Sequence, residues 1–212
     1  MQPSRWQVVA LVVALCLLSG AVGYLIGRPD DSQPFNKVDV GFLSDMQTHH
    51  GGAIALAFAY QPRQHDPLLS QISREIILDQ AQQISQMNTY LDRFGNQPSA
   101  DDNVAMDWMG LAVPKDQMPG MPTNADMQRL ESSQGLAADD VFSELMIKHH
   151  AAGVAMSDYE VEHGDNPDAQ RLAAAMARVQ RSEIAEMNTR RRELGLQPID
   201  ATALEDLHAH AN

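Results

Sequence analysis

Two pairs of adjacent histidines, His49-His50 and His149-His150, are the residues of this chain best suited to chemistry. A methionine stands three residues before each pair, so Met-x-x-His-His occurs twice, beginning at Met46 and at Met146. On a helix the methionine lies one turn from both histidines, so the three side chains can face the same way. Imidazole binds zinc, copper, iron and nickel, whereas a thioether is a soft ligand that favours copper(I). The motif predicts a metal site, with copper as the best match and zinc or iron ranked below it.

The two motifs belong to an internal duplication with a period of 100 residues and no gap. Positions identical in the two copies include Phe42/Phe142, Met46/Met146, His49/His149, His50/His150, Gln80/Gln180, Ile84/Ile184, Met87/Met187, Asn88/Asn188, Thr89/Thr189, Gly95/Gly195, Gln97/Gln197 and Pro98/Pro198. Besides the histidines, the candidate ligands are Met46, Met87 and Gln80 in the first copy, and Met146, Met187, Gln180 and Glu183 in the second. A bundle interior would therefore gather four imidazoles and four thioethers.

A purely structural role for the histidines is the alternative. A buried imidazole needs its N–H group satisfied, and Gln80 and Gln180 are suitable partners. Methionine is also an ordinary filler of hydrophobic cores. A ferritin-like di-iron site ranks lower still, because it needs inward Glu-x-x-His motifs and no Glu stands three residues before either pair. We find no nucleophile with a base at a recognisable spacing, no phosphate loop and no HExxH, so the sequence does not favour an enzyme.

The spacing of apolar residues predicts that these candidates lie on four long helices in two hairpins. Phe42 to Tyr60 and the matching stretch of the second copy each carry one apolar face, and a second amphipathic helix follows each of them. Asp66-Pro67 and Asn166-Pro167 are typical starts for those second helices, and Gly95 and Gly195 are typical ends. Two such hairpins can bury their apolar stripes against each other. We expect an all-α four-helix bundle with inward-facing histidines.

A methionine-rich segment connects the two hairpins. Met118 and Met121 alternate with Pro119 and Pro122, and these prolines keep the segment extended. We expect a flexible arm that binds soft metals and lies outside the core. Thr123 to Gly135 is expected to form a short helix, with Thr123 and Asp126 as a capping box.

The chain begins with an uncharged, mostly apolar run from Val8 to Ile26. Its length approaches that of a bilayer core, roughly 30 Å at about 1.5 Å per residue. Arg5 precedes the run and an acidic stretch follows it, so we expect a single-pass plasma-membrane protein with an extracytoplasmic C-terminal domain. A cleaved signal peptide is the alternative. Cys16 is the only cysteine, so the folded domain has no disulfide and no thiolate site.

The expected organisation is an N-terminal transmembrane anchor (1–27), a linker (28–36), a duplicated bundle (37–200) and a C-terminal tail (201–212). Within the bundle, repeat 1 spans 37–98, the connection 99–138 and repeat 2 139–198. The net charge of −13 argues against a nucleic-acid partner, which would need a basic face.

The stretch MPGMPTNADMQRLESSQGLAADDVFSELMIKHHAAGVAM, followed by QRSEIAEMNTRRREL, closely resembles the DUF305 family of exported bacterial proteins. The resemblance covers roughly Phe42 to Pro198 and implies a ferritin-like four-helix bundle. It also implies copper binding, since some members are associated with copper binding and copper tolerance outside the cytoplasm. The implied ligand set is Met146, His149, His150, Gln180, Glu183 and Met187, with Met46, His49, His50, Gln80 and Met87 in the first copy. Gln83 stands where the second copy has Glu183, which predicts a weaker first site.

Three functions remain open from the sequence, the weakest of which is a metal-dependent redox enzyme. The leading one is a membrane-anchored extracytoplasmic copper-binding protein for buffering, tolerance or delivery, with the metal ion as its partner. The alternative is a helical interaction module, or an accessory subunit of a membrane complex, whose histidines are structural.

Overall fold

The structure, a computed structural model, describes residues 34–93, 95 and 103–205, and consists mainly of α-helices. The expected transmembrane anchor (1–27), most of the linker and the end of the tail with His208 and His210 lie outside the described residues. Of the helices that are described, none has the length and apolar character needed to cross a membrane.

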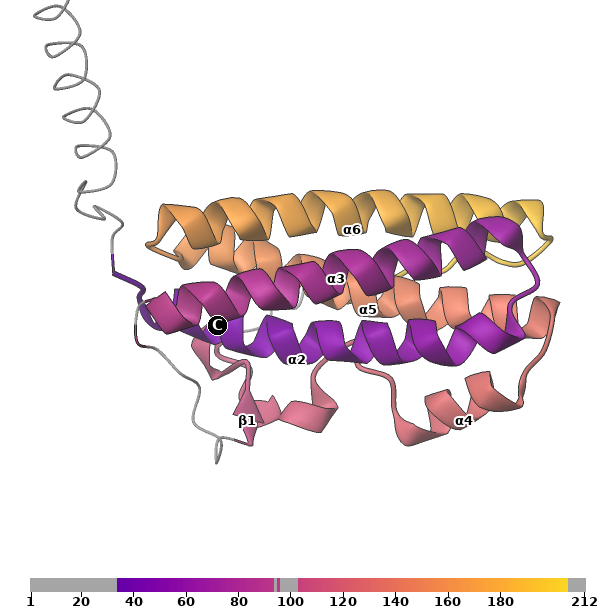
Figure 1. Cartoon of the computed structure of the whole chain (residues 1–212), viewed down its shortest axis with the longest axis horizontal. Coiled ribbons are helices and arrows are strands. Elements are labelled where there is room, and N and C mark those ends of the chain that lie inside the picture. The colour runs from indigo at the N-terminus through magenta and orange to yellow at the C-terminus, as the bar shows by residue number, and fades with distance from the viewer. Residues whose placement is uncertain (1–33, 94, 96–102, 206–212) are drawn as a thin grey trace, which may run out of the picture. The chain divides into compact units, whose positions relative to one another are not determined.

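Four long helices lie side by side in the described chain (Figure 1). They are α2 (Lys37–Tyr60), α3 (Pro67–Arg93), α5 (Leu136–His163) and α6 (Pro167–Glu193). Two hairpins form because α2 packs along α3 and α5 packs along α6, and the hairpins meet mainly through α2 and α5. Contacts between α3 and α6 are few. The predicted all-α bundle of two helical hairpins is confirmed.

Polar caps start these helices at the predicted places. The Asp66 carboxylate and the Asn166 side chain each accept hydrogen bonds from the amides of the second and third residues after them. Pro67 and Pro167 therefore open α3 and α6, where the missing proline N–H costs nothing. After α6, Gly195 adopts a φ of 76°, a left-handed conformation that favours glycine.

The two hairpins are tied together by an exchange of caps. Asp39, in the first turn of α2, accepts the Asn166 amide at the start of α6, at 3.0 Å. Its counterpart Asp139, in the first turn of α5, accepts the Tyr60 hydroxyl at 2.6 Å and the Asp66 amide at 3.3 Å. Each hairpin thus caps the second helix of the other, and both carboxylates are buried. The exchange gives the bundle an approximate two-fold relation that follows the sequence duplication.

The described part of the connection between the hairpins has secondary structure of its own. It contains two very short antiparallel strands, β1 (Val104–Ala105) and β2 (Val113–Pro114), and helix α4 (Asn124–Ser132). The predicted capping box of Thr123 and Asp126 is confirmed. Short 3₁₀ turns complete the fold at η1 (Gln61–Arg63), η2 (Asp107–Met109) and η3 (Lys115–Gln117), and α7 (Thr202–Glu205) ends the described chain.

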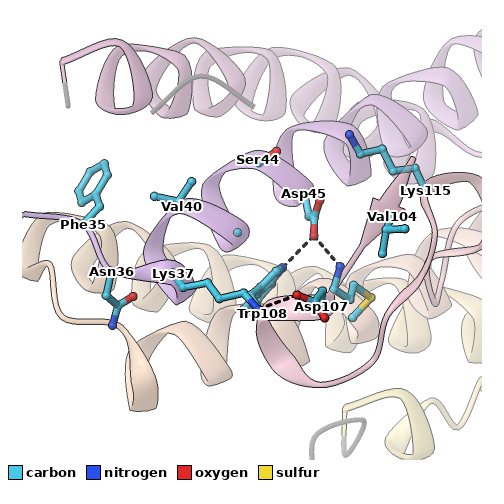
Figure 2. Close-up of a pocket in the computed structure, with 12 residues that line it drawn as sticks. Phe35, Asn36, Lys37, Val40, Ser44, Asp45, Val104, Asp107, Trp108 and Lys115 are labelled. Atoms are coloured by element: carbon cyan, nitrogen blue, oxygen red, sulfur yellow. Dashed lines mark hydrogen bonds and ion pairs between the residues drawn. The ribbon is translucent and has the colours of Figure 1, made fainter. Parts of the chain in front are cut away.

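Asp45 on α2 fastens this connection to the bundle. Its carboxylate accepts the Met106 amide at 2.7 Å and the Trp108 indole N–H at 2.8 Å (Figure 2). The indole lies so close to Gly41 that a Cβ at that position would overlap it. Beside this anchor is an open cavity of about 430 Å³, whose rim carries Lys37 and Lys115.

The expectation of a free methionine arm is wrong for Met118, which is 2% exposed and part of the core. Met121 is half-buried and packs against the same cluster. Seven methionines belong to this cluster: Met46, Met87, Met106, Met109, Met118, Met156 and Met176. The prolines do not keep this segment extended, because Met118–Met121 forms a β-turn in which the Met121 amide donates to the Met118 carbonyl at 3.1 Å and Gly120 lies against α5. Figure 1 shows the connection running beside α2 rather than projecting from the bundle.

Candidate metal centre

His49 and His149 form the middle of the candidate site. Their rings are fully or almost fully buried, with centroids 3.8 Å apart and planes inclined by 31°. His149 Nε2 lies 2.8 Å from the carbonyl oxygen of His49, and His49 Nε2 lies 3.3 Å from the carbonyl oxygen of Pro119. If these Nε2 atoms donate, each ring leaves Nδ1 as a lone-pair nitrogen, and no described residue hydrogen-bonds to either Nδ1.

His50 and His150 flank this pair and face the second helix of their own hairpin. His50 Nε2 lies 2.6 Å from Gln83 Oε1, and His150 Nε2 lies 2.8 Å from Glu183 Oε2. The second contact is a close approach of an imidazole to a carboxylate, without the angles of a good hydrogen bond. The Nδ1 atoms of His50 and His150 also have no described partner.

The glutamines that the sequence suggested as partners of the histidines do not take that role. Gln80 and Gln180 are 4% and 3% exposed, and their Oε1 atoms accept no hydrogen bond from any described residue. The residues that reach the imidazoles are Gln83 and Glu183, almost one turn further along α3 and α6. Residues three apart on a helix share a face but lie at different positions along its axis. The imidazoles lie level with Gln83 and Glu183, and Gln80 and Gln180 lie almost one turn away.

The segment Met118–Met121 closes one side of the His49–His149 pair. Gly120 has a φ of 76°, and a Cβ there would come within 2.9 Å of the His149 Cα and the Lys148 carbonyl. The Met121 sulfur lies next to Gly52 on α2, where a Cβ would stand 2.7 Å from that sulfur and 3.5 Å from His149 Nε2. The glycines thus allow the loop to approach both helices and bring a thioether to the imidazoles.

Burial keeps the imidazoles of His49, His50 and His149 neutral at physiological pH. It lowers the pKa of His49 to about 3, with the neighbouring His50 adding to the shift. Burial also lowers the pKa of His50 to about 4, although the hydrogen bond to Gln83 opposes it. The pKa of His149 is lowered well below its usual value, by burial first and by the other histidines next. A neutral imidazole retains the lone pair that a metal requires.

The other predicted thioethers are divided between two places. Met46 and Met87 lie in the methionine-rich cluster, whereas Met146 and Met187 lie in the second core cluster, which contains Tyr60 and Phe142. All four are fully buried. Their role as direct ligands stays a prediction. Within the described ranges, no three His, Asp or Glu side chains converge on one point.

Three features that support the site were not predicted from the sequence. Asp39 and Asp139 repeat at the same 100-residue interval as the histidines, so a signal for the exchanged caps was present. The contact between His49 and the Pro119 carbonyl could not be predicted from residue types, because every residue has the same backbone carbonyl group. Asp45 has Leu145 as its counterpart, and its task as an anchor follows only from the position of Trp108.

Together the fold and the site define a duplicated four-helix bundle with a buried His–Met centre. The chain matches the family model described as "Domain of unknown function (DUF305)" over residues 39–191, and it belongs to the DUF305 family. The resemblance identified from the sequence is thereby confirmed. Comparison with curated proteins finds no significant match.

Several solved structures are similar to this one. A DUF305 protein from Streptomyces coelicolor has a TM-score of 0.69 and 32% identity, and the match covers 77% of this chain and 96% of that chain. A DUF305 fragment from Deinococcus radiodurans has a TM-score of 0.63 and 28% identity, covering 77% of this chain and 99% of that chain. CopM in its Cu(II)-bound form has a TM-score of 0.58 and 25% identity, covering 73% of this chain and 96% of CopM.

Proposed function

We propose that this protein is a membrane-anchored, extracytoplasmic copper-binding protein that buffers or delivers the metal. The observation that carries the proposal is the buried His49–His149 pair beneath the Met118–Met121 segment. It combines neutral imidazoles and unpartnered Nδ1 atoms with the Met121 thioether, which lies beside Gly52 as His149 Nε2 does, and these donor types suit copper(I). The apolar N-terminal run supports the membrane anchor, and the absence of cysteine from the body of the chain suits an exported domain.

The similarity to CopM, which was solved in Cu(I)-bound and Cu(II)-bound forms, supports the choice of copper. The site itself argues against a hard oxygen-loving cation, because among the described residues only Glu183 supplies a carboxylate close to its four histidines. Zinc competes for imidazole but gains little from thioethers.

The test is a competition titration of the purified full-length chain in detergent against a chromophoric copper(I) chelator. We expect tight binding by the native chain. Simultaneous His49→Ala and His149→Ala substitutions should weaken it at least tenfold. His163→Ala is the matched control, because His163 is exposed at the end of α5.

Met121→Leu separates binding from folding. Leucine keeps the bulk of this half-buried side chain but removes the sulfur, so the fold should persist while copper(I) affinity falls. Far-UV circular dichroism checks each variant. If the native chain and the double histidine variant bind copper(I) equally weakly while both are folded, the proposal is wrong and the helical interaction module becomes the better explanation.

A further inference from the structure

The groove between α3 and α6 contains a group of polar side chains, and two of them have buried oxygen atoms without a hydrogen-bond partner among the described residues. A small cavity of about 10 Å³ lies there, and it is lined by Asp79, Gln80 and Gln83 of α3 and by Gln180 and Glu183 of α6, among others. This volume is close to that of one water molecule or one unhydrated ion. The groove exists because α3 and α6 make few contacts with each other.

Two of these side chains point to a ligand. Gln80 and Gln180 are more than nine-tenths buried, and their Oε1 atoms have no hydrogen-bond partner among the described residues. A buried amide oxygen without a donor is destabilising, so natural proteins rarely keep two of them together without a use. On the α5 side, Gly153 makes the space for Gln180, because a Cβ at that position would overlap the amide oxygen.

Two side chains that line this cavity, one from each helix, also contact a histidine of the candidate metal centre. Glu183 lines the cavity, is 16% exposed, and contacts the fully buried His150. Gln83 lines it from the opposite helix and bonds to His50. The other side of the cluster is closed where Gly120 presses against α5. The α3–α6 groove is therefore the side on which polar groups connect solvent to the imidazoles.

The acidic residues that line the groove occupy different positions on α3 and α6. Asp79 stands exposed on α3, whereas its counterpart on α6 is Val179. Glu183 faces His150, whereas its counterpart Gln83 is neutral. The described lining of the cavity includes two acids and no Lys or Arg. A cation that approaches the groove is attracted by both Asp79 and Glu183. Of these two carboxylates, that of Glu183 contacts His150, a histidine of the second copy.

We propose that the α3–α6 groove is the access route for the metal cation, with Asp79 attracting the ion and Glu183 passing it to His150, so that the His150 side is loaded before the His50 side. The inference rests on the proposed function. Asp79 acts as a steering residue that does not bind the ion in its final place.

Stopped-flow mixing of the full-length chain in detergent with copper(II), followed by quenching of intrinsic fluorescence, tests this route. Asp79→Asn should lower the association rate about threefold to tenfold and make it less dependent on salt, without changing the stoichiometry. Glu183→Gln should slow association and weaken binding. Glu186→Gln is the matched control, because it removes the same charge from the exposed face of α6 outside the groove.

A gain-of-function variant sharpens the test. Gln83→Glu gives the first copy the carboxylate of the second, so we expect a second rapid phase of copper(II) binding. If Asp79→Asn and Glu186→Gln change the rate and its salt dependence equally, the groove is not the route, although copper binding itself would stand. If the native chain binds no copper at equilibrium, the proposed function fails and this inference fails with it.

Discussion

Glu160 predicts an unusual dependence of stability on pH. Its side chain is fully buried near the end of α5, where its carboxyl group faces that of Asp39 beside Gly164. Burial first, and the interaction with Asp39 second, raise the pKa of Glu160 to about 9. The nearby Asp165 contributes in the same direction. At the equivalent position of the first copy, Tyr60 donates its hydroxyl to Asp139. A protonated Glu160 is therefore the counterpart of the tyrosine, a neutral group beside the capping carboxylate.

The direction in which the free energy of unfolding changes with pH follows from the number of protons bound in the folded and unfolded states. Above pH 4.5 the unfolded chain releases the Glu160 proton, whereas the folded chain keeps it up to about pH 9. The folded state therefore binds one more proton in this window, and the free energy of unfolding falls as the pH rises. One proton corresponds to about 1.4 kcal/mol per pH unit, so the loss attributable to Glu160 is up to about 3 kcal/mol between pH 4.5 and 7.

Glu160→Gln should remove this loss, because glutamine is neutral at every pH and has a similar shape. The assay is urea unfolding of the full-length chain in detergent at pH 5, 6, 7 and 8, followed by circular dichroism. We expect the stability difference between Glu160→Gln and the native chain to grow in favour of the variant as pH rises. Glu162→Gln is the control, because Glu162 is exposed and faces solvent. A difference that is flat with pH would refute the assignment of a buried, protonated Glu160.

Three further predictions concern the contacts that hold the site in place. Tyr60→Phe removes one donor from the buried Asp139 and should cost about 1–3 kcal/mol in urea unfolding, measured against the native chain. Gly120→Ala should destabilise the fold by more than Gly195→Ala, because both glycines have a φ of 76° but only Gly120 is packed against other atoms. Equal losses in these two variants would mean that the loop does not press on α5. Asp45→Ala leaves the Trp108 indole and the Met106 amide without their acceptor, so tryptophan emission should shift to the red; an unchanged spectrum would contradict the anchoring role.

Much of the fold could be read from local signals. Apolar spacing and the Asp66-Pro67 and Asn166-Pro167 pairs located the helices, because helix starts depend on side-chain acceptors and proline within a few residues. The duplication predicted two similar hairpins, and the described structure contains them. The path of the connection was predicted wrongly, since Met118 is buried in a cluster of residues from distant parts of the chain, among them Phe42 and Met156, which its own neighbours in sequence do not reveal.

The types of donor and their register follow from local sequence: two His pairs, each one turn from a methionine, on the inward faces of equivalent helices. These are local properties of helix periodicity. Which donors meet depends on how the helices pack. Packing of α2 against α5 brought His49 onto His149, and the register of α3 and α6 gave the histidines Gln83 and Glu183 as partners in place of the repeated glutamines. Helix pairing is a non-local choice made by burying whole faces, so no spacing along the chain could have shown it.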